Sequence, residues 1–168
     1  MKKELTESLE KYLLAIHEIV KTNQAARVKD VSKFLNIGAP ATSDAVKTLA
    51  TKGFVNYVPY GIITLTEKGK KSAEEKISRT KIISNFLEKV LMLPSDKINK
   101  YTSEIEFSMS EEVLDRFVKF LHFMKSCSCK EPKWVKSYKH YAKSGVMQNK
   151  CLECIKSNSK SCCDNCAK

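Results

Sequence analysis

Apolar side chains in the first fifty residues recur at intervals of three and four, the spacing of one face of a helix. The first such segment runs from about residue 6 to residue 21 and stops where Asn23 and Gln24 interrupt the pattern. Its apolar positions are Leu9, Tyr12, Leu13, Ile16, Ile19 and Val20. A second, shorter helix is predicted over residues 28–35. It is expected to bury Val28, Val31, Phe34 and Leu35.

A tight turn over residues 36–38 separates this helix from a third one. We expect Gly38 to take the positive φ that the turn needs, and Pro40 suits a first helical position. The third helix is predicted to run to about Lys52 and to end at Gly53. Its inward face would carry Ala45, Val46 and Leu49.

The pattern then changes to that of strands. Two β-prone runs, residues 54–58 and 62–65, are joined by Pro59, Tyr60 and Gly61, which predicts a hairpin. Three helices followed by a hairpin within about 65 residues are typical of a winged helix-turn-helix, whose third helix enters the DNA major groove.

The outward side of the third helix supplies candidate DNA contacts. Small side chains there let backbone N–H groups approach phosphates, and Asp44 could accept a hydrogen bond from a cytosine amine. Lysines near this helix could bind phosphates; the alternative is an ordinary solvated helix face. The predicted contacts are Pro40, Ala41, Ser43, Asp44, Lys47, Thr48, Lys29 and Lys33, with Lys52 as a further phosphate contact.

Further helices follow the hairpin. Thr66 is a suitable N-cap for a long helix that Pro94 would interrupt, Ser95 and Asp96 would cap a second helix, and Ser110 a third. Their apolar positions include Ile77, Ile83, Phe86, Leu87, Val90, Leu91, Ile98, Tyr101, Ile105, Val113, Phe117, Phe120, Leu121 and Met124. So many apolar positions beside a small winged domain predict a homodimerisation unit, because a dimer matches two half-sites on DNA.

Charge and cysteine content divide the chain further. The formal charge of +11 favours a polyanionic partner. Residues 127–168 carry nine basic and three acidic side chains and all seven cysteines. The sequence therefore predicts a mainly α protein: a winged helix-turn-helix domain (1–75), a helical dimerisation domain (76–126) and a basic cysteine-rich tail (127–168). With no secretory signal and no membrane-length apolar run, we expect a cytoplasmic protein.

The sequence resembles the diphtheria-toxin-repressor family of metal-dependent regulators, which includes the manganese transport regulators. The resemblance covers residues 5–125 and is carried by LEKYLLAIHEI, RVKDVSKFLNIGAPATSDAVKTLATKGFV, ITLTEKGKKSAE and EIEFSMSEEVLDRF. It implies a dimer that binds double-stranded operator DNA and represses metal-uptake genes when loaded with iron or manganese.

The family's metal-ligand positions are degenerate in this chain. The resemblance places them at Lys11, Thr80, Ser84, Ser103, Glu106 and Phe107, with a further one near Asn99. Only Glu106 keeps a recognisable ligand. One carboxylate near an ammonium group holds a hard divalent ion poorly, so we expect Glu106 to pair with Lys11 in place of the metal.

The tail holds a different candidate centre. Two CxxC pairs, separated by eight residues, supply the four thiolates that a tetrahedral zinc ion or an iron–sulfur cluster requires. The predicted ligands are Cys151, Cys154, Cys163 and Cys166, with Cys127, Cys129 and Cys162 as alternatives. The surplus cysteines favour an iron–sulfur cluster over zinc; a zinc-pinned tail and a reversible thiol switch are the alternatives.

These observations predict a dimeric DNA-binding regulator that senses iron or redox status through the cysteine centre. Two other functions stay open: a regulator whose tail carries only structural zinc, and a winged-helix module that binds a protein partner of an iron-transport system. The sequence contains no phosphate loop or nucleophile–histidine pair, so we do not expect an enzyme.

Overall fold

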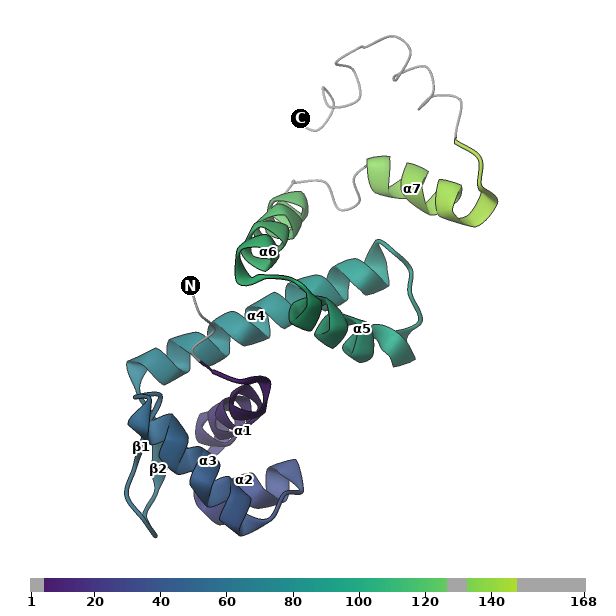
Figure 1. Ribbon diagram of the computed structural model, residues 1–168. Helices are drawn as coiled ribbons and strands as arrows, with labels where there is room; N and C mark the ends of the chain where they lie inside the picture. The colour runs from purple at the N-terminus through teal and green to yellow at the C-terminus, as the bar shows by residue number, and fades with distance from the viewer. Residues whose placement is uncertain (1–4, 127–132, 148–168) are drawn as a thin grey trace. The chain divides into compact units, whose positions relative to one another are not determined.

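The computed structural model describes residues 5–126 and 133–147 (Figure 1). Contacts divide the chain into two compact units, Met1–Ser78 and Arg79–Lys168. Helix α4 (Glu67–Lys89) begins in the first unit and ends in the second. In the described residues, helices dominate and the only sheet has two strands, as the sequence predicted.

The first unit contains α1 (Glu7–Asn23), α2 (Val28–Leu35), α3 (Ala39–Thr51) and a hairpin of β1 (Val55–Tyr57) and β2 (Ile63–Leu65). The strands are antiparallel, with Val55 opposite Leu65 and Tyr57 opposite Ile63. Ala26, just before α2, adds a bridge to Ile63. This order of elements confirms the winged helix-turn-helix (Figure 1).

Local chemistry places the ends of these elements. Thr6 Oγ1 accepts a hydrogen bond from the Leu9 N–H at 3.4 Å and caps α1. Gln24 ends α1 in the left-handed region at φ 63°, and Gly53 follows α3 at φ 76°, both where the sequence breaks the helical pattern. The hydroxyl of Thr66 accepts from the Gly69 N–H at 3.0 Å and caps α4. These starts and stops are as predicted.

The turn before α3 differs from the prediction. Asn36, not Gly38, takes the left-handed conformation, at φ 53°, while Gly38 lies at φ −58° as the residue preceding α3. Asn tolerates this region better than other non-glycine residues. The prediction that Phe34 is buried is also wrong. Its side chain is 57% exposed, because the inward face of α2 is formed by Val31 with the partly buried Val28 and Leu35.

The second unit contains the end of α4, α5 (Ser95–Ser108), α6 (Glu111–Ser126) and α7 (Lys133–Ser144). A separate core joins α4, α5 and α6 through Ile83, Leu87, Ile98, Leu114 and Leu121. The rings of Phe86 and Phe117 meet edge to face at its margin, with centroids 6.1 Å apart.

Three details of this unit differ from the sequence predictions. Helix α4 ends at Lys89, before Pro94, and Met92 takes a positive φ of 57° between them. Ser95 lies inside α5 and bonds Glu88 instead of capping the helix. The apolar stripe of α6 is rotated: Leu114 and Leu121 are buried, whereas Val113 and Phe120 are more than half exposed.

The helices of the described residues include none that is long and apolar enough to cross a membrane. The domain limits predicted from the sequence, at 75 and 126, stay predictions. The contact-defined boundary falls between Ser78 and Arg79, within α4.

Candidate nucleic-acid interface and metal positions

Burial of one face of α3 leaves the other face outward. Val46 and Leu49 are completely buried, and so is Thr42, whose hydroxyl donates to the Gly38 carbonyl at 3.1 Å. That bond closes the first turn of α3 onto the residue that precedes it. The N-terminal half of α3 is therefore held in a fixed register by its buried side.

The outward face of α3 carries the candidate contacts that the sequence singled out. Pro40, Ala41, Asp44, Lys47 and Thr48 are exposed, and Ser43 is half-buried. The lysines on α2 and after α3 are exposed as well, namely Lys29, Lys33 and Lys52. An exposed helix face, together with exposed amines on α2, on α3 and just after α3, suits a groove lined by phosphates. Contact with DNA stays a prediction.

One acidic side chain lies in the middle of this face. Asp44 Oδ1 is 3.4 Å from Lys47 Nζ, one turn further along α3. Both groups are exposed, so the pair contributes little to stability. Its effect is local: the amine offsets a carboxylate that would otherwise repel phosphate.

The hairpin ends in exposed apolar side chains, which sequence reasoning did not single out. Val58 is 71% exposed, Tyr60 is completely exposed, and Ile62 is 54% exposed. The Gly61 N–H donates to the Val58 carbonyl at 2.9 Å and closes the turn. The alternation of exposed Val58, Tyr60 and Ile62 with polar or turn residues was the available signal.

In the second unit, three positions that the resemblance assigned to metal ligands, Thr80, Ser84 and Glu106, take part in hydrogen bonds between α4 and α5. Thr80 Oγ1 on α4 donates to Glu106 Oε1 on α5 at 3.1 Å. One turn along α4, the hydroxyls of Ser84 and Thr102 are 3.0 Å apart. Thr102 and Glu106 are both buried, at 1% and 8% exposure.

The other family metal positions do not join this group. Ser103 and Phe107 are exposed. Lys11 lies on α1 in the first unit, where its amine is 3.2 Å from Glu7 Oε1. Because Lys11 and Glu106 belong to different units, the pairing of the two expected from the sequence stays a prediction.

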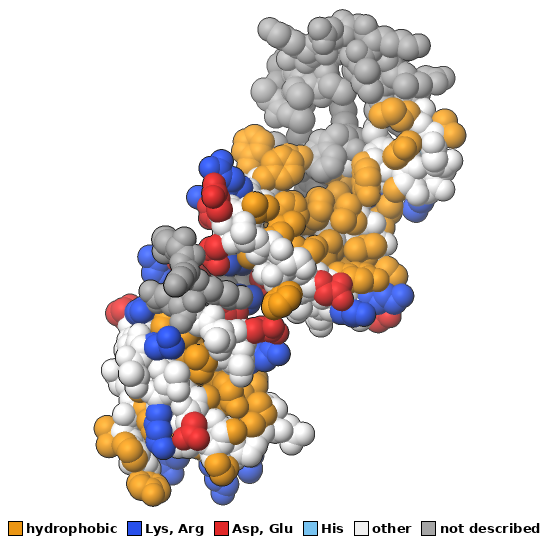
Figure 2. Space-filling view, viewed as in Figure 1, with side chains coloured by type: hydrophobic (Ala, Val, Ile, Leu, Met, Phe, Trp, Pro, Cys, Tyr) orange, Lys and Arg blue, Asp and Glu red, His pale blue; other side chains and the backbone are white. Residues whose placement is uncertain are grey.

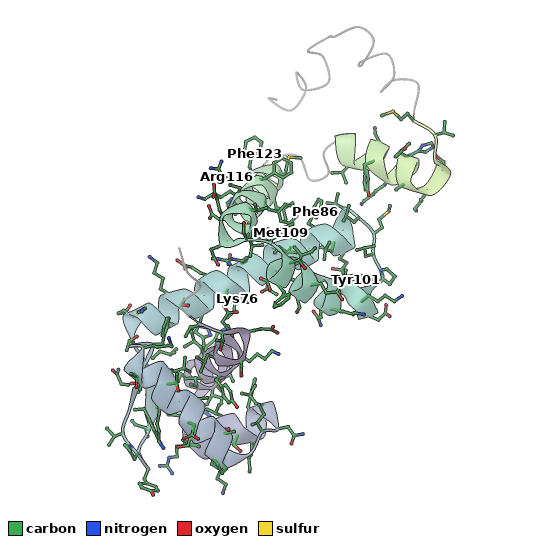
Figure 3. All side chains as sticks on the ribbon, in the orientation of Figure 1. Lys76, Phe86, Tyr101, Met109, Arg116 and Phe123 are labelled. Atoms are coloured by element: carbon green, nitrogen blue, oxygen red, sulfur yellow. The ribbon has the colours of Figure 1, made fainter. Side chains whose placement is uncertain are left out.

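Apolar side chains also gather on the surface of the second unit. In Figure 2, hydrophobic side chains cover much of its visible face, and Phe123 is labelled on α6 in Figure 3. On α5 and α6 the large exposed apolar side chains are Phe107, Val113, Phe120 and Phe123, at 52–78% exposure. Exposed large apolar side chains in such number are typical of a surface that another chain covers.

Comparison with known families accounts for both units. Residues 4–63 match the family model described as iron dependent repressor, N-terminal DNA binding domain, and residues 66–135 match iron dependent repressor, metal binding and dimerisation domain. The chain belongs to the iron-dependent repressor family. It is therefore a transcriptional regulator by family, and not an enzyme, as the sequence predicted.

Individual repressor-family relatives support this membership. An uncharacterized HTH-type transcriptional regulator of Methanocaldococcus jannaschii is 34% identical over 122 residues, which cover 72% of this chain and 98% of that protein. The transcriptional regulator MntR of Escherichia coli is 31% identical, over 66% of this chain and 71% of that protein.

Solved structures show the same fold. The manganese regulator SloR superposes with a TM-score of 0.57 at 27% identity, over 71% of this chain and 55% of that one. The IdeR structure from T. acidophilum gives 0.53 at 23% identity, again over 71% of this chain and 55% of that one. The chain thus spans about half the length of these two structures.

The residues at the positions that the resemblance assigns to metal ligands do not fit a hard divalent ion. Thr80 already donates to the one carboxylate, and hydroxyls are weak ligands for Mn²⁺ or Fe²⁺ beside carboxylate and imidazole. In the described residues, no three His, Cys, Asp or Glu side chains lie together as a metal site. The predicted cysteine ligands, Cys127, Cys129 and the five cysteines from Cys151 to Cys166, lie outside the described residues.

Sequence reasoning found Thr80, Ser84 and Glu106 but missed Thr102. Thr102 is completely enclosed and bonds Ser84 from the facing helix. The available signal was its spacing of four residues from Glu106 on the same helix.

Proposed function

We propose that this repressor-family chain is a homodimeric regulator that binds double-stranded operator DNA through α3 and its flanking lysines. The observation that carries the proposal is the exposed face of the N-terminal half of α3, held by the buried Thr42, together with the exposed amines of Lys47 on α3 and of Lys29 and Lys33 on α2. It supports binding in a major groove, where helix side chains reach base edges and amines reach phosphates.

The second unit supports the dimeric form. Phe107, Phe120 and Phe123 are each more than half exposed, and its family model is described as a dimerisation domain. Covering such rings with the same surface of a second copy removes apolar area from water. A dimer would present two α3 helices to two half-sites on DNA.

A second part of the proposal concerns the iron or redox signal to which operator binding responds. The cysteines of the tail would bind iron as an iron–sulfur cluster, and occupancy would change operator affinity; structural zinc is the alternative. This part is supported by the paired CxxC spacing alone. The iron centre changes the DNA affinity only if it binds more tightly to one of two states of the regulator, the DNA-binding state or the other state.

DNA binding is tested with the full chain and a random duplex pool. Selected duplexes are sequenced, and the affinity for the enriched duplex is then measured from 50 to 200 mM salt. We expect a two-fold symmetric site and a steep loss of affinity with salt, because each phosphate contact releases counterions. An unenriched pool with a weak salt dependence would contradict operator binding and would favour a protein partner.

The signal is tested on protein purified without oxygen. Iron, acid-labile sulfide and zinc are quantified, and operator affinity is compared before and after removal of the centre at fixed salt. Iron with sulfide and a change in affinity would support sensing. A colourless protein with about one zinc per chain, whose DNA affinity is the same with and without oxygen, would contradict sensing and indicate a structural zinc site in the tail.

A further inference from the structure

Helices α4 and α5 are joined by polar side-chain bonds at three successive turns of α4. The Thr80 hydroxyl donates a hydrogen bond to Glu106 Oε1 at 3.1 Å, and the hydroxyl oxygens of Ser84 and Thr102 are 3.0 Å apart. The Ser95 hydroxyl donates to Glu88 Oε1 at 3.3 Å. We name these three bonds the polar ladder. The positions on α4 are four residues apart, so its rungs lie on one face of the helix.

The two inner rungs are shielded from water. Thr102 is 1% exposed and Glu106 is 8% exposed, whereas the outer rung between Glu88 and Ser95 is exposed. A hydrogen bond to a buried carboxylate is stronger than one between neutral groups, and a buried acceptor left unpaired is costly. The inner rungs therefore hold α4 and α5 in one register.

These inner rungs occupy the positions where relatives would place metal ligands. Thr80, Ser84 and Glu106 are three of the degenerate positions, in a domain whose family model is described as metal binding. A divalent ion at Glu106 would have to displace the Thr80 hydroxyl and would gain no second carboxylate from Ser84 or Ser103. The donor set favours the hydrogen bond over the ion.

We propose that the polar ladder replaces the divalent metal as the link between α4 and α5, so that the second unit assembles without an ion. Manganese or ferrous iron then has no effect on the fold of this unit. Where operator binding is the readout, the inference rests on the proposed function: the affinity for DNA would not respond to Mn²⁺. Any signal would have to enter elsewhere in the chain.

Melting of the full chain tests the ladder directly. The protein is stripped with a chelator, and its Tm is recorded alone and with added Mn²⁺, a hard ion that thiolates of the tail bind poorly. We expect no shift of Tm with Mn²⁺. Thr80→Val, which removes only the hydroxyl, is expected to lower Tm by roughly 2–6 °C.

Two variants serve as matched controls. Thr80→Ser keeps the hydroxyl and should retain most of the Tm. Ser103→Ala alters an exposed family metal position outside the ladder and should leave Tm unchanged. The same four proteins are tested for binding to the enriched duplex with and without Mn²⁺, and Mn²⁺ should change none of the affinities.

Two results would overturn the inference. One is a rise in Tm or operator affinity with Mn²⁺ that Glu106→Gln abolishes, since this would mean that the ion binds at Glu106. The other is a Thr80→Val variant that melts at the temperature of the unmodified chain. If none of the proteins binds DNA, the proposed function is rejected instead. The Tm values would then still test the polar ladder, because they do not depend on DNA binding.

Discussion

Asp44 and Lys47 form an ion pair on the exposed face of α3, with Oδ1 and Nζ 3.4 Å apart. The pair places an acidic group within the surface that is proposed to meet a polyanion. In the complex, phosphate would compete for the amine of Lys47, and the carboxylate would be free to accept a hydrogen bond from a cytosine amine.

Asp44→Ala is therefore expected to change specificity and non-specific affinity in opposite directions. Removing the negative charge should strengthen binding to random-sequence DNA, and loss of the carboxylate acceptor should relax the preference at one base pair by about 1–3 kcal/mol. Selection from a random duplex pool measures both effects. Glu18→Gln removes an exposed charge from α1 and serves as the control; equal behaviour of the two variants would contradict a base contact by Asp44.

Lys47→Ala should weaken DNA binding for every sequence tested. If Lys47 contacts one phosphate, the slope of log affinity against log salt should fall by about 1. Fluorescence anisotropy over a salt series measures the slope. Lys100→Ala removes an exposed lysine from α5 and should leave it unchanged; an unchanged slope in Lys47→Ala would remove this residue from the interface.

Gly69→Ala is expected to destabilise the first unit strongly. A Cβ atom at this position would lie 1.9 Å from the Phe54 carbonyl oxygen, which itself accepts from the Thr66 N–H at 3.1 Å. Either β1 or the first turn of α4 must move, at a cost on the order of 3 kcal/mol. Urea unfolding measures it. Gly38→Ala, whose Cβ would meet nothing closer than 3.8 Å, is the comparison and should lose much less.

Phe123→Ser should shift the chain from dimer to monomer. The ring is 66% exposed on α6, and covering it in a dimer would contribute roughly 1.5–3 kcal/mol per copy. Sedimentation velocity over a range of concentrations follows the shift. Phe34→Ser removes a similarly exposed ring from the first unit and should leave the dimer intact. Identical sedimentation of both variants and the unmodified chain would place the interface elsewhere.

Restoring the family's ligand types should create a metal site. The triple variant Thr80→His, Ser103→Glu and Phe107→His would add one carboxylate and two imidazoles to the carboxylate of Glu106. We expect it to bind Mn²⁺ when the unmodified chain does not, since oxygen and imidazole donors suit this ion. Titration calorimetry with Mn²⁺ checks this. The same variant with Glu106→Gln should no longer bind Mn²⁺. If it still binds Mn²⁺, the assignment of the metal-ligand positions to these residues is wrong.

Much of the fold follows from local sequence. Thr6, Gln24, Gly53 and Thr66 begin or end helices where they were expected to, because caps and left-handed residues act on backbone groups within a few positions. Helical spacing also predicted the buried side of α1. The winged helix-turn-helix could therefore be predicted from the order and length of its elements.

Other features depend on residues that are distant in the sequence. Phe34 has the spacing of a core residue but is exposed, because the side of α2 that packs on the core carries Val28, Val31 and Leu35. Ala26 pairs with Ile63 although nothing in its own sequence context favours a strand. The sequence identified Asp44, Lys47 and the degenerate metal positions as notable, but not what surrounds each of them.

The sequence by itself determined the ends of α1, the end of α3, the start of α4 and the hairpin, and it predicted the loss of all but one metal ligand, since residue type and spacing act locally. Only the tertiary structure decided what replaced the ligands. Thr80 and Ser84 meet Glu106 and Thr102 because two helices pack side by side, with 26 and 18 residues separating the partners. A hydrogen bond depends on that three-dimensional approach to within about 3 Å, which no local pattern encodes.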